Sequence, residues 1–184
     1  MSQRDSTYER KPRDFYATPA WVTAAALPHL PLRLELEAGA IWEPACGNGD
    51  MVRVLEQAGF TVVASDITDG DDFLFMMGII PPVKAIITNP PYNLAHEFCE
   101  HALRLTKRTH GVVAMLLGSD FDYAKSRASL FRDCPQFAKK IALTKRIVWF
   151  VEDNGKPKAS PSENHAWYVW DWKHEGPPTI GYAP

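Results

Sequence analysis

Short apolar runs alternate with amphipathic stretches along most of this chain, and this alternation constrains the fold more than any other feature. Runs rich in Val, Ile and Ala predict buried strands, and apolar residues at helical spacing predict the helices between them. The predicted strands are 39–42, 60–64, 83–88, 111–117, 145–151 and 165–172, and the predicted helices are 19–30, 51–58, 93–106 and 124–131. The pattern predicts an α/β fold with a mostly parallel sheet covered on both faces. The last two strands have no helix between them and should form an antiparallel pair.

Polar and turn-forming residues follow the ends of the predicted strands. In sheets of this kind, ligands bind beyond the carboxyl ends of the strands. The segments at such ends are 43–49, Asp66, Asp72, 89–92, 119–123 and 152–164. We therefore expect them to converge on one crevice.

The strand at 83–88 runs into Asn89-Pro90-Pro91-Tyr92. Two consecutive prolines cannot extend a strand, because each lacks an amide proton and fixes φ. The turn suits an amino group on a flat ring: Asn89 and the Pro90 carbonyl can accept its two N–H bonds while Tyr92 stacks on the ring. Taken alone, the tetrapeptide is equally compatible with a proline turn in which Asn89 caps and Tyr92 packs.

A glycine turn, Glu43-Pro44-Ala45-Cys46-Gly47-Asn48-Gly49, joins the first predicted strand to a helix, and Asp66 follows Gly47 by 19 positions. In nucleotide-binding α/β sheets an acid about 20 residues past such a turn holds ribose hydroxyls. The third glycine of that motif is missing here, so a tight strand-to-helix turn also explains the pattern. Further along, Asp72 can accept a bond from an adenine amino group and Phe73 can cover the ring. The other interpretation is an acidic surface loop with Phe73 in the core.

Length and composition limit the class of protein. A chain of 184 residues with 46% hydrophobic content is one domain with an ample core, and we expect a flexible arm at 1–14 before a single domain at 15–184. The formal net charge of −2 provides no global basic field, so affinity for nucleic acid needs local patches. The three cysteines have no disulfide or metal spacing, so we expect no bound metal. No apolar run reaches membrane-spanning length, and we expect a cytoplasmic protein without membrane partners.

The ordered set of 15–19, 43–49, Ser65-Asp66, Asp72-Phe73 and 89–92 resembles the S-adenosylmethionine-dependent adenine amino (N6) DNA methyltransferases with an Asn-Pro-Pro-Tyr motif. The likeness is greatest to compact phage-like or orphan members, and the motifs are specific as a group. The resemblance implies a Rossmann-like class I methyltransferase fold: a mostly parallel seven-stranded sheet with an antiparallel carboxyl-terminal hairpin. It also implies S-adenosylmethionine as the cofactor.

The same resemblance assigns cofactor contacts. Gly47 and its neighbours would pack against the methionine part, Asp66 would hold the ribose, and Asp72 with Phe73 would hold the adenine. The segment 15–18 would flank the methionine end. The complete implied set is Phe15, Tyr16, Thr18, Glu43, Pro44, Cys46, Gly47, Asn48, Gly49, Asp66, Ile67, Asp72 and Phe73.

The catalytic set implied by the motif is Asn89, Pro90, Pro91 and Tyr92. An adenine amino nitrogen is a poor nucleophile, and none of these groups is a strong base. Hydrogen bonds to its two hydrogens favour a tetrahedral nitrogen whose lone pair points at the methyl donor. We therefore expect direct in-line transfer, with positioning carrying most of the rate.

Substrate contacts are expected from Tyr92 and from later loops. A duplex base must flip out to reach such a crevice, and stacking on Tyr92 can offset part of the cost. Further candidates are Phe121 and Tyr123 for the substrate side, Lys156 and Lys158 for phosphates, and His165 for the base pocket. Each also has an ordinary interpretation, as a loop, core or solvated surface residue.

Several alternatives stay open at this point. The site also suits an RNA base amino group or a protein glutamine amide, and a cofactor-binding subunit without catalytic activity would have the same motifs. A separate target-recognition domain does not fit in 184 residues. Specificity is therefore expected to be low, or to come from short loops, from a homodimer mate or from a separate specificity subunit. DNA is the main expected partner.

Overall fold

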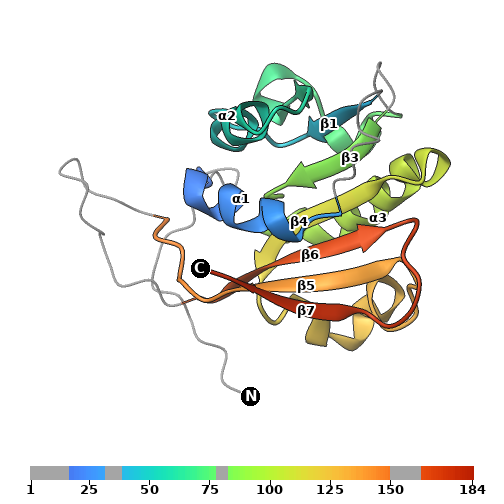
Figure 1. Ribbon diagram of the computed structural model, residues 1–184. Coiled ribbons are helices and arrows are strands. Elements are labelled where there is room, and N and C mark those ends of the chain that lie inside the picture. The colour runs from blue at the N-terminus through green and yellow to red at the C-terminus, as the bar shows by residue number, and fades with distance from the viewer. Residues whose placement is uncertain (1–16, 32–38, 78–82, 150–162) are drawn as a thin grey trace.

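The computed structural model describes residues 17–31, 39–77, 83–149 and 163–184 (Figure 1). The predicted arm at 1–14 lies outside these residues, and so do Phe15, Tyr16, Lys156 and Lys158. No helix in the described part of the chain is both long enough and apolar enough to cross a membrane.

A single seven-stranded sheet forms the centre of the molecule, in the order β2-β1-β3-β4-β6-β5-β7. Only β6 runs antiparallel to its neighbours β4 and β5, and all other paired strands are parallel. The strands are β1 (Ala40–Glu43), β2 (Val62–Ala64), β3 (Val83–Thr88), β4 (Val112–Gly118), β5 (Phe137–Leu143), β6 (His165–Asp171) and β7 (Thr179–Ala183). This sheet confirms the predicted α/β fold, including the antiparallel hairpin of β5 and β6.

The first strand of that hairpin was wrongly placed. It spans Phe137–Leu143, whereas the sequence pattern predicted 145–151. Lys139 and Lys140 interrupt the apolar run of β5, but both amines have partners: Lys140 bonds to Asp122 and Ser119, and Lys139 to the His29 carbonyl. Strand β7 was not predicted. Most of its five residues are exposed, so its sequence lacks the alternation of apolar and polar residues that marks a half-buried strand.

The helices agree more closely with the sequence. They are α1 (Ala20–Ala26), α2 (Asp50–Gln57) and α3 (Ala95–Thr106). The predicted helix at 19–30 continues past α1 only as the short 3-10 helix η2 (Leu27–His29), which contains Pro28. The predicted helix at 124–131 is a 3-10 helix, η9 (Lys125–Leu130).

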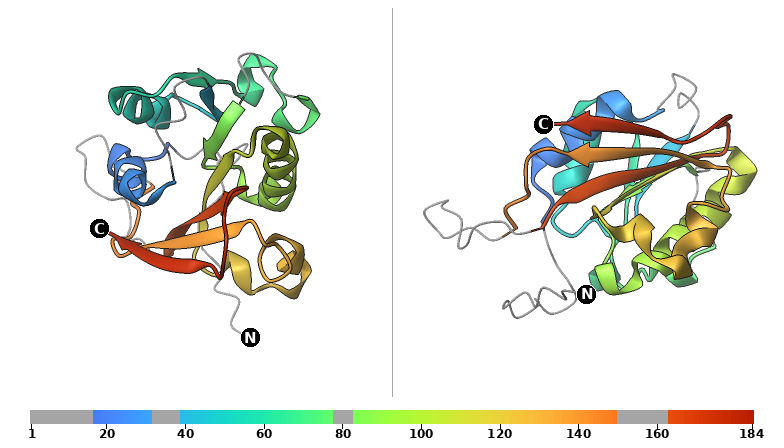
Figure 2. Two further views of the ribbon diagram at one scale, coloured as in Figure 1. Left: turned by 45° about the vertical axis from the view of Figure 1, so that its right-hand side comes forward. Right: turned by 90° about the horizontal axis from the view of Figure 1, so that it is seen from below.

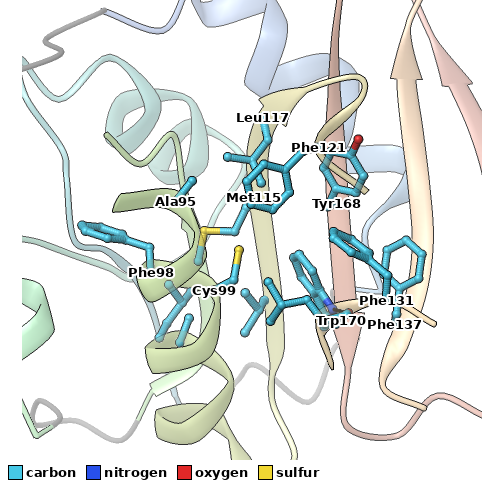
Figure 3. Packing of buried hydrophobic residues seen from close by; sticks show 14 of the residues in the cluster. Ala95, Phe98, Cys99, Met115, Leu117, Phe121, Phe131, Phe137, Tyr168 and Trp170 are labelled. Carbon is cyan, nitrogen blue, oxygen red and sulfur yellow. Dashed lines mark hydrogen bonds between the residues drawn. The ribbon is translucent and has the colours of Figure 1, made fainter. Parts of the chain in front are cut away.

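The helices cover both faces of the sheet, as predicted. Helices α1 and α2 lie on one side and α3 on the other (Figure 2). On the α1 side, buried Val22 and Leu55 belong to the same apolar cluster as Trp167. On the α3 side, Phe98 belongs to a second cluster, whose aromatic rings continue along β6 to Tyr168 and Trp170 (Figure 3).

The strand directions bring several chain segments to one edge. The carboxyl ends of the parallel strands β1, β2, β3, β4 and β5 face the same way, as does the amino end of β6. In the sheet register, Thr88 of β3 pairs with Met115 of β4, and Gly118 of β4 pairs with His165 of β6. This carboxyl edge holds most of the predicted site residues.

Candidate active site

The Asn89-Pro90-Pro91-Tyr92 turn follows β3 at the carboxyl edge. Pro90 is buried, whereas Asn89 and Tyr92 are half-buried. Pro91 caps the 3-10 helix η6 (Tyr92–Leu94), and its carbonyl accepts a bond of 2.9 Å from the Leu94 amide. The strand ends before the prolines, as predicted. Tyr92 is the first residue of the short helix, which fixes the position of its backbone.

Thr18 orients the Asn89 side chain. The Asn89 Nδ2 atom donates a hydrogen bond of 3.1 Å to Thr18 Oγ1, although the two residues are 71 positions apart. Thr18 is 6% exposed, and it stands directly before Pro19, the residue that caps α1. Because the amide nitrogen is directed at Thr18, the amide oxygen of Asn89 faces the opposite way, as an acceptor must.

Glu43 is the last residue of β1, and its side chain is 1% exposed. Thr88 Oγ1 donates a hydrogen bond of 2.5 Å to Glu43 Oε1, while Oε2 has no hydrogen-bond partner among the described residues. Burial raises the pKa of Glu43 to about 8, and the bond from Thr88 and the nearby Ala45 amide offset only part of this. The carboxyl is therefore protonated at neutral pH. The sequence analysis did not identify Thr88 as a site residue. The available sign was that Thr88 is a polar residue at the end of an otherwise apolar strand.

The glycine turn after β1 is fastened to the end of β2. Gly47 and Gly49 have φ values of +50° and +75°, which favour glycine, and Gly49 caps α2. The Gly47 amide donates 2.9 Å to Asp66 Oδ2, and the Cys46 amide donates 3.1 Å to the Ser65 carbonyl. Asp66 thus braces the turn, in addition to any ligand it holds.

The other residues predicted around this turn differ in exposure. Pro44 is buried behind the turn, and Asn48 is exposed, with its carbonyl bound to Arg53. Burial raises the pKa of the partly buried Cys46 thiol, which stays neutral. The carboxylate of Asp66 also accepts bonds of 2.9 Å and 2.8 Å from the amide and hydroxyl of Thr68.

Asp72 and Phe73 lie at the start of the second 3-10 helix after β2. Asp72 Oδ1 accepts 3.0 Å from the Leu74 amide and caps η5 (Phe73–Phe75). The Phe73 ring is 2% exposed and packs into the core, with its centroid 5.2 Å from that of Trp42 and 4.8 Å from that of Phe98. Its ring is therefore not placed to cover a ligand at the edge. Ile67, in contrast, is 51% exposed beside Asp66.

Phe121 and Tyr123 separate in the loop after β4. Phe121 is a core residue, 8% exposed, and its ring lies 6.0 Å from Phe131. The Arg127 guanidinium covers it at 3.8 Å and also bonds to its carbonyl. Tyr123 is 78% exposed, with Lys140 Nζ 5.1 Å from its ring centre. Of these two predicted substrate contacts, only Tyr123 presents its ring to solvent.

His165 begins β6 next to the Asn89 turn. Its ring centre lies 6.1 Å from that of Tyr92 and 5.2 Å from that of Trp149, which meets it edge-on at 75°. Burial lowers the pKa of His165 to about 4, so the imidazole is neutral at physiological pH. Trp149 was predicted to pack within a strand, but it lies outside the sheet.

Two cations at this edge were missed by the sequence analysis. Lys145 and Arg146 follow β5, and the error arose because they were assigned to a strand. Lys145 Nζ lies 4.8 Å from the ring centre of Trp21, and Arg146 Nε donates 2.9 Å to the Asn164 side chain. Both side chains are exposed.

Comparison with known proteins identifies the fold. No protein-family model matches the sequence, and no curated protein matches it. A solved structure from Listeria monocytogenes, described as a class I S-adenosylmethionine-dependent methyltransferase, matches 89% of this chain with a TM-score of 0.56 and 15% identity. The type IIG restriction endonuclease BpuSI matches 83% with a TM-score of 0.50 and 12% identity. The match covers 64% of the Listeria protein and 24% of BpuSI. The chain therefore has the Rossmann-like class I methyltransferase fold.

Proposed function

We propose that this protein is an S-adenosylmethionine-dependent methyltransferase that methylates the exocyclic amino group of adenine in DNA by direct in-line transfer. The observation that carries the proposal is the Asn89 turn, which lies at the carboxyl edge of a methyltransferase-type sheet with its amide already oriented by Thr18. An amide oxygen fixed in this way is preorganised to accept a hydrogen bond from an amino group.

The acidic residues around the glycine turn are complementary in charge to the cofactor. S-adenosylmethionine is a cation at its sulfonium and its amino group, and Glu43 is a buried acid whose Oε2 has no hydrogen-bond partner among the described residues. A cation bound nearby would favour the charged form of Glu43 and offset the cost of its burial. The carboxylates of Asp66 and Asp72 remain the candidates for ribose and adenine. The exposed Ile67 side chain replaces the Phe73 ring as the apolar surface beside them.

When bound, the cofactor supplies a methyl group already activated for transfer. The chain's own residues then act on the acceptor. Asn89 Oδ1 and the Pro90 carbonyl would accept the two amino hydrogens, which favours a tetrahedral nitrogen with its lone pair directed at the methyl group. The new nitrogen–carbon bond would form as the methyl–sulfur bond breaks, the neutral thioether would leave, and the methylated amino group would lose one proton to solvent. Tyr92 supports the ring from one face. Positioning of this kind can be worth roughly 7–11 kcal/mol, whereas general-base help typically gives about 10²–10⁴-fold in rate.

Two observations support the proposed substrate: the first favours a nucleic acid, and the second favours DNA. Lys145 and Arg146 stand exposed at the carboxyl edge, where the phosphates on either side of a flipped base would pass. One of the solved structures that resemble this chain, BpuSI, is a type IIG restriction endonuclease. Lys156 and Lys158 lie outside the described residues and stay candidates for phosphate contacts.

The experiment that tests the proposal offers labelled S-adenosylmethionine with unmethylated double-stranded DNA, single-stranded DNA, total RNA and cell protein in parallel. The proposal predicts label in DNA, recovered after hydrolysis as N6-methyladenine. Label recovered only in RNA, or only in protein as a methylated glutamine, would replace the substrate. Cofactor binding without any transfer would instead indicate a subunit that needs a catalytic partner.

A further inference from the structure

His165 is a buried polar side chain whose hydrogen-bonding capacity is unused. The residue is 2% exposed, and neither Nδ1 nor Nε2 has a hydrogen-bond partner among the described residues. Buried polar groups are normally paired, because leaving one unpaired costs free energy of folding. An unpaired buried group at the carboxyl edge suggests that a bound ligand supplies its hydrogen-bond partner.

The state of the ring determines what it can offer. Burial is the main reason that the pKa of His165 is lowered to about 4, and the backbone of Glu163 offsets this in part. The imidazole is therefore neutral at the pH of a cell. A neutral imidazole has one N–H donor and one acceptor nitrogen.

The position of the ring connects it with the Asn89 turn. His165 pairs with Gly118 in the sheet, and its ring centre lies 6.1 Å from that of Tyr92, the residue proposed to support the acceptor base. Trp149 also packs against the imidazole, edge-on. The imidazole is thus a direct neighbour of the Tyr92 ring, on which we propose that the acceptor base stacks.

Asn89 and Pro90 account for the amino hydrogens but not for the rest of the base. Adenine carries a ring nitrogen acceptor on each side of its amino group, N1 and N7, and neither has a partner in the proposed mechanism. We propose that His165 is a specificity residue whose ring N–H donates a hydrogen bond to one of these ring nitrogens. This inference rests on the proposed function, and it deepens that function by assigning the group that reads the purine edge.

The test uses random-sequence DNA in which every adenine is natural adenine, 1-deazaadenine or 7-deazaadenine. Each analogue keeps the amino group and replaces one acceptor nitrogen by C–H. Methyl transfer is measured as kcat/KM for the wild-type protein and for His165→Phe, which keeps an aromatic ring without a donor. A penalty caused only by altered amino reactivity appears in both proteins and cancels in the comparison.

The expected result is that one analogue lowers kcat/KM of the wild-type protein by about tenfold or more, and that this penalty disappears in His165→Phe. His165→Gln retains a donor and should restore part of the discrimination. His174→Gln, at the opposite end of β6, is the matched control and should behave as wild type. Thermal melting and S-adenosylmethionine binding show that each variant is folded.

The inference is overturned if the wild-type protein methylates both analogues as well as adenine, or if the penalties are the same in wild type and in His165→Phe. If His165→Phe does not fold, the proposal is tested by comparing the analogue penalties of the wild-type protein with those of His165→Gln. Absence of methyl transfer to natural adenine DNA overturns the proposed function itself. Transfer to adenine DNA with unchanged analogue penalties overturns only the role of His165.

Discussion

The two halves of the carboxyl edge use their polar groups differently. On the side of β1, β2 and β3, the acids and the amide are fastened to one another: Asp66 to the Gly47 amide, Glu43 to Thr88, and Asn89 to Thr18. On the side of β5 and β6, one charged cluster holds a loop, whereas His165 has no hydrogen-bond partner in the described structure. Glu43, Asp66 and Asn89 are thus each held in place by a bond to a neighbour, whereas we propose that His165 gains its bond only when its ligand arrives.

The first expected effect is a loss of stability that concerns the charged cluster holding the loop after β4. Lys140 Nζ bonds to both Asp122 oxygens at 2.9 Å and to the Ser119 carbonyl at 2.8 Å. Lys140→Met would leave the largely buried Asp122 without its cation and should lower the free energy of unfolding by about 3 kcal/mol. Urea denaturation measures the change. Cofactor affinity should be unaffected, because the glycine turn is in the other half.

Lys139→Met is the matched control, since the Lys139 amine has only a bond of 3.3 Å to the His29 carbonyl. The double variant Lys140→Met with Asp122→Asn should recover part of the lost stability. A loss as large in Lys139→Met as in Lys140→Met would show that removing any β5 lysine destabilises the strand, and that the loop bonds are unimportant.

The next effect is a pH dependence that originates in Glu43. Its pKa is about 8 in the folded protein and near 4.5 when exposed. Between these values the folded state holds a proton that the unfolded state has released, so the free energy of unfolding falls as pH rises from about 4.5 to 8. Glu43→Gln removes this loss and should be more stable than wild type at pH 8 by about 4 kcal/mol.

Thermal or urea unfolding across this pH range tests the Glu43 prediction, with exposed Glu56→Gln as control. The Glu56 variant should follow the wild-type curve. If the stability difference between Glu43→Gln and wild type is the same at pH 5 and pH 8, Glu43 does not titrate as its burial requires.

A smaller effect is expected from Thr18→Val, which removes the acceptor that orients Asn89. Without this bond the Asn89 amide rotates more freely, and kcat should fall by about tenfold with little change in KM for the cofactor. Thr23→Val is the control in α1, because Thr23 Oγ1 is buried without a hydrogen-bond partner among the described residues. Equal losses in both variants would attribute the effect to α1 packing.

The smallest effect concerns the exposed cations of the second half. Lys145→Ala with Arg146→Ala should weaken DNA binding several-fold and reduce the slope of log affinity against log salt by about 1–2. The pair Lys107→Ala and Arg108→Ala, which follows α3 at the opposite edge, should leave the slope unchanged. Fluorescence anisotropy over a salt series measures both. An unchanged slope in the variant Lys145→Ala with Arg146→Ala would show that these two cations do not contact DNA phosphates.

Much of the first half, at β1, β2 and β3, could be predicted from the sequence, because its signals are local. The β-branched run of β3 ends at two prolines, and the glycine turn of β1 precedes a helix with a first-turn acid, Asp50. Each of these features fixes backbone geometry within a few residues. The bond between Thr18 and Asn89 was not predictable, since it depends on how α1 packs across 71 positions of chain.

The second half misled sequence analysis for a related reason. From sequence alone the lysines of β5 look like solvent-exposed residues, and only the fold shows that Ser119 and Asp122 lie beside Lys140. The apolar run after β5 resembles a strand in sequence, but it is an irregular segment whose Ile147 side chain is buried in the core. Phe73 shows the same dependence on context, because only the packing of α3 reveals that its ring faces Phe98. Tertiary contacts decided these cases.

The most direct test of the central claim measures cofactor binding and methyl transfer side by side in Asn89→Ala and in Asn93→Ala. Asn93 is exposed in η6, the short helix that follows the Asn89 turn, and serves as the matched control. Both variants are predicted to bind S-adenosylmethionine within about twofold of wild type, whereas transfer to DNA should fall by about 10³-fold in Asn89→Ala alone. Retained transfer in Asn89→Ala, or an equal loss in Asn93→Ala, would contradict the assignment of the Asn89 turn as the catalytic site.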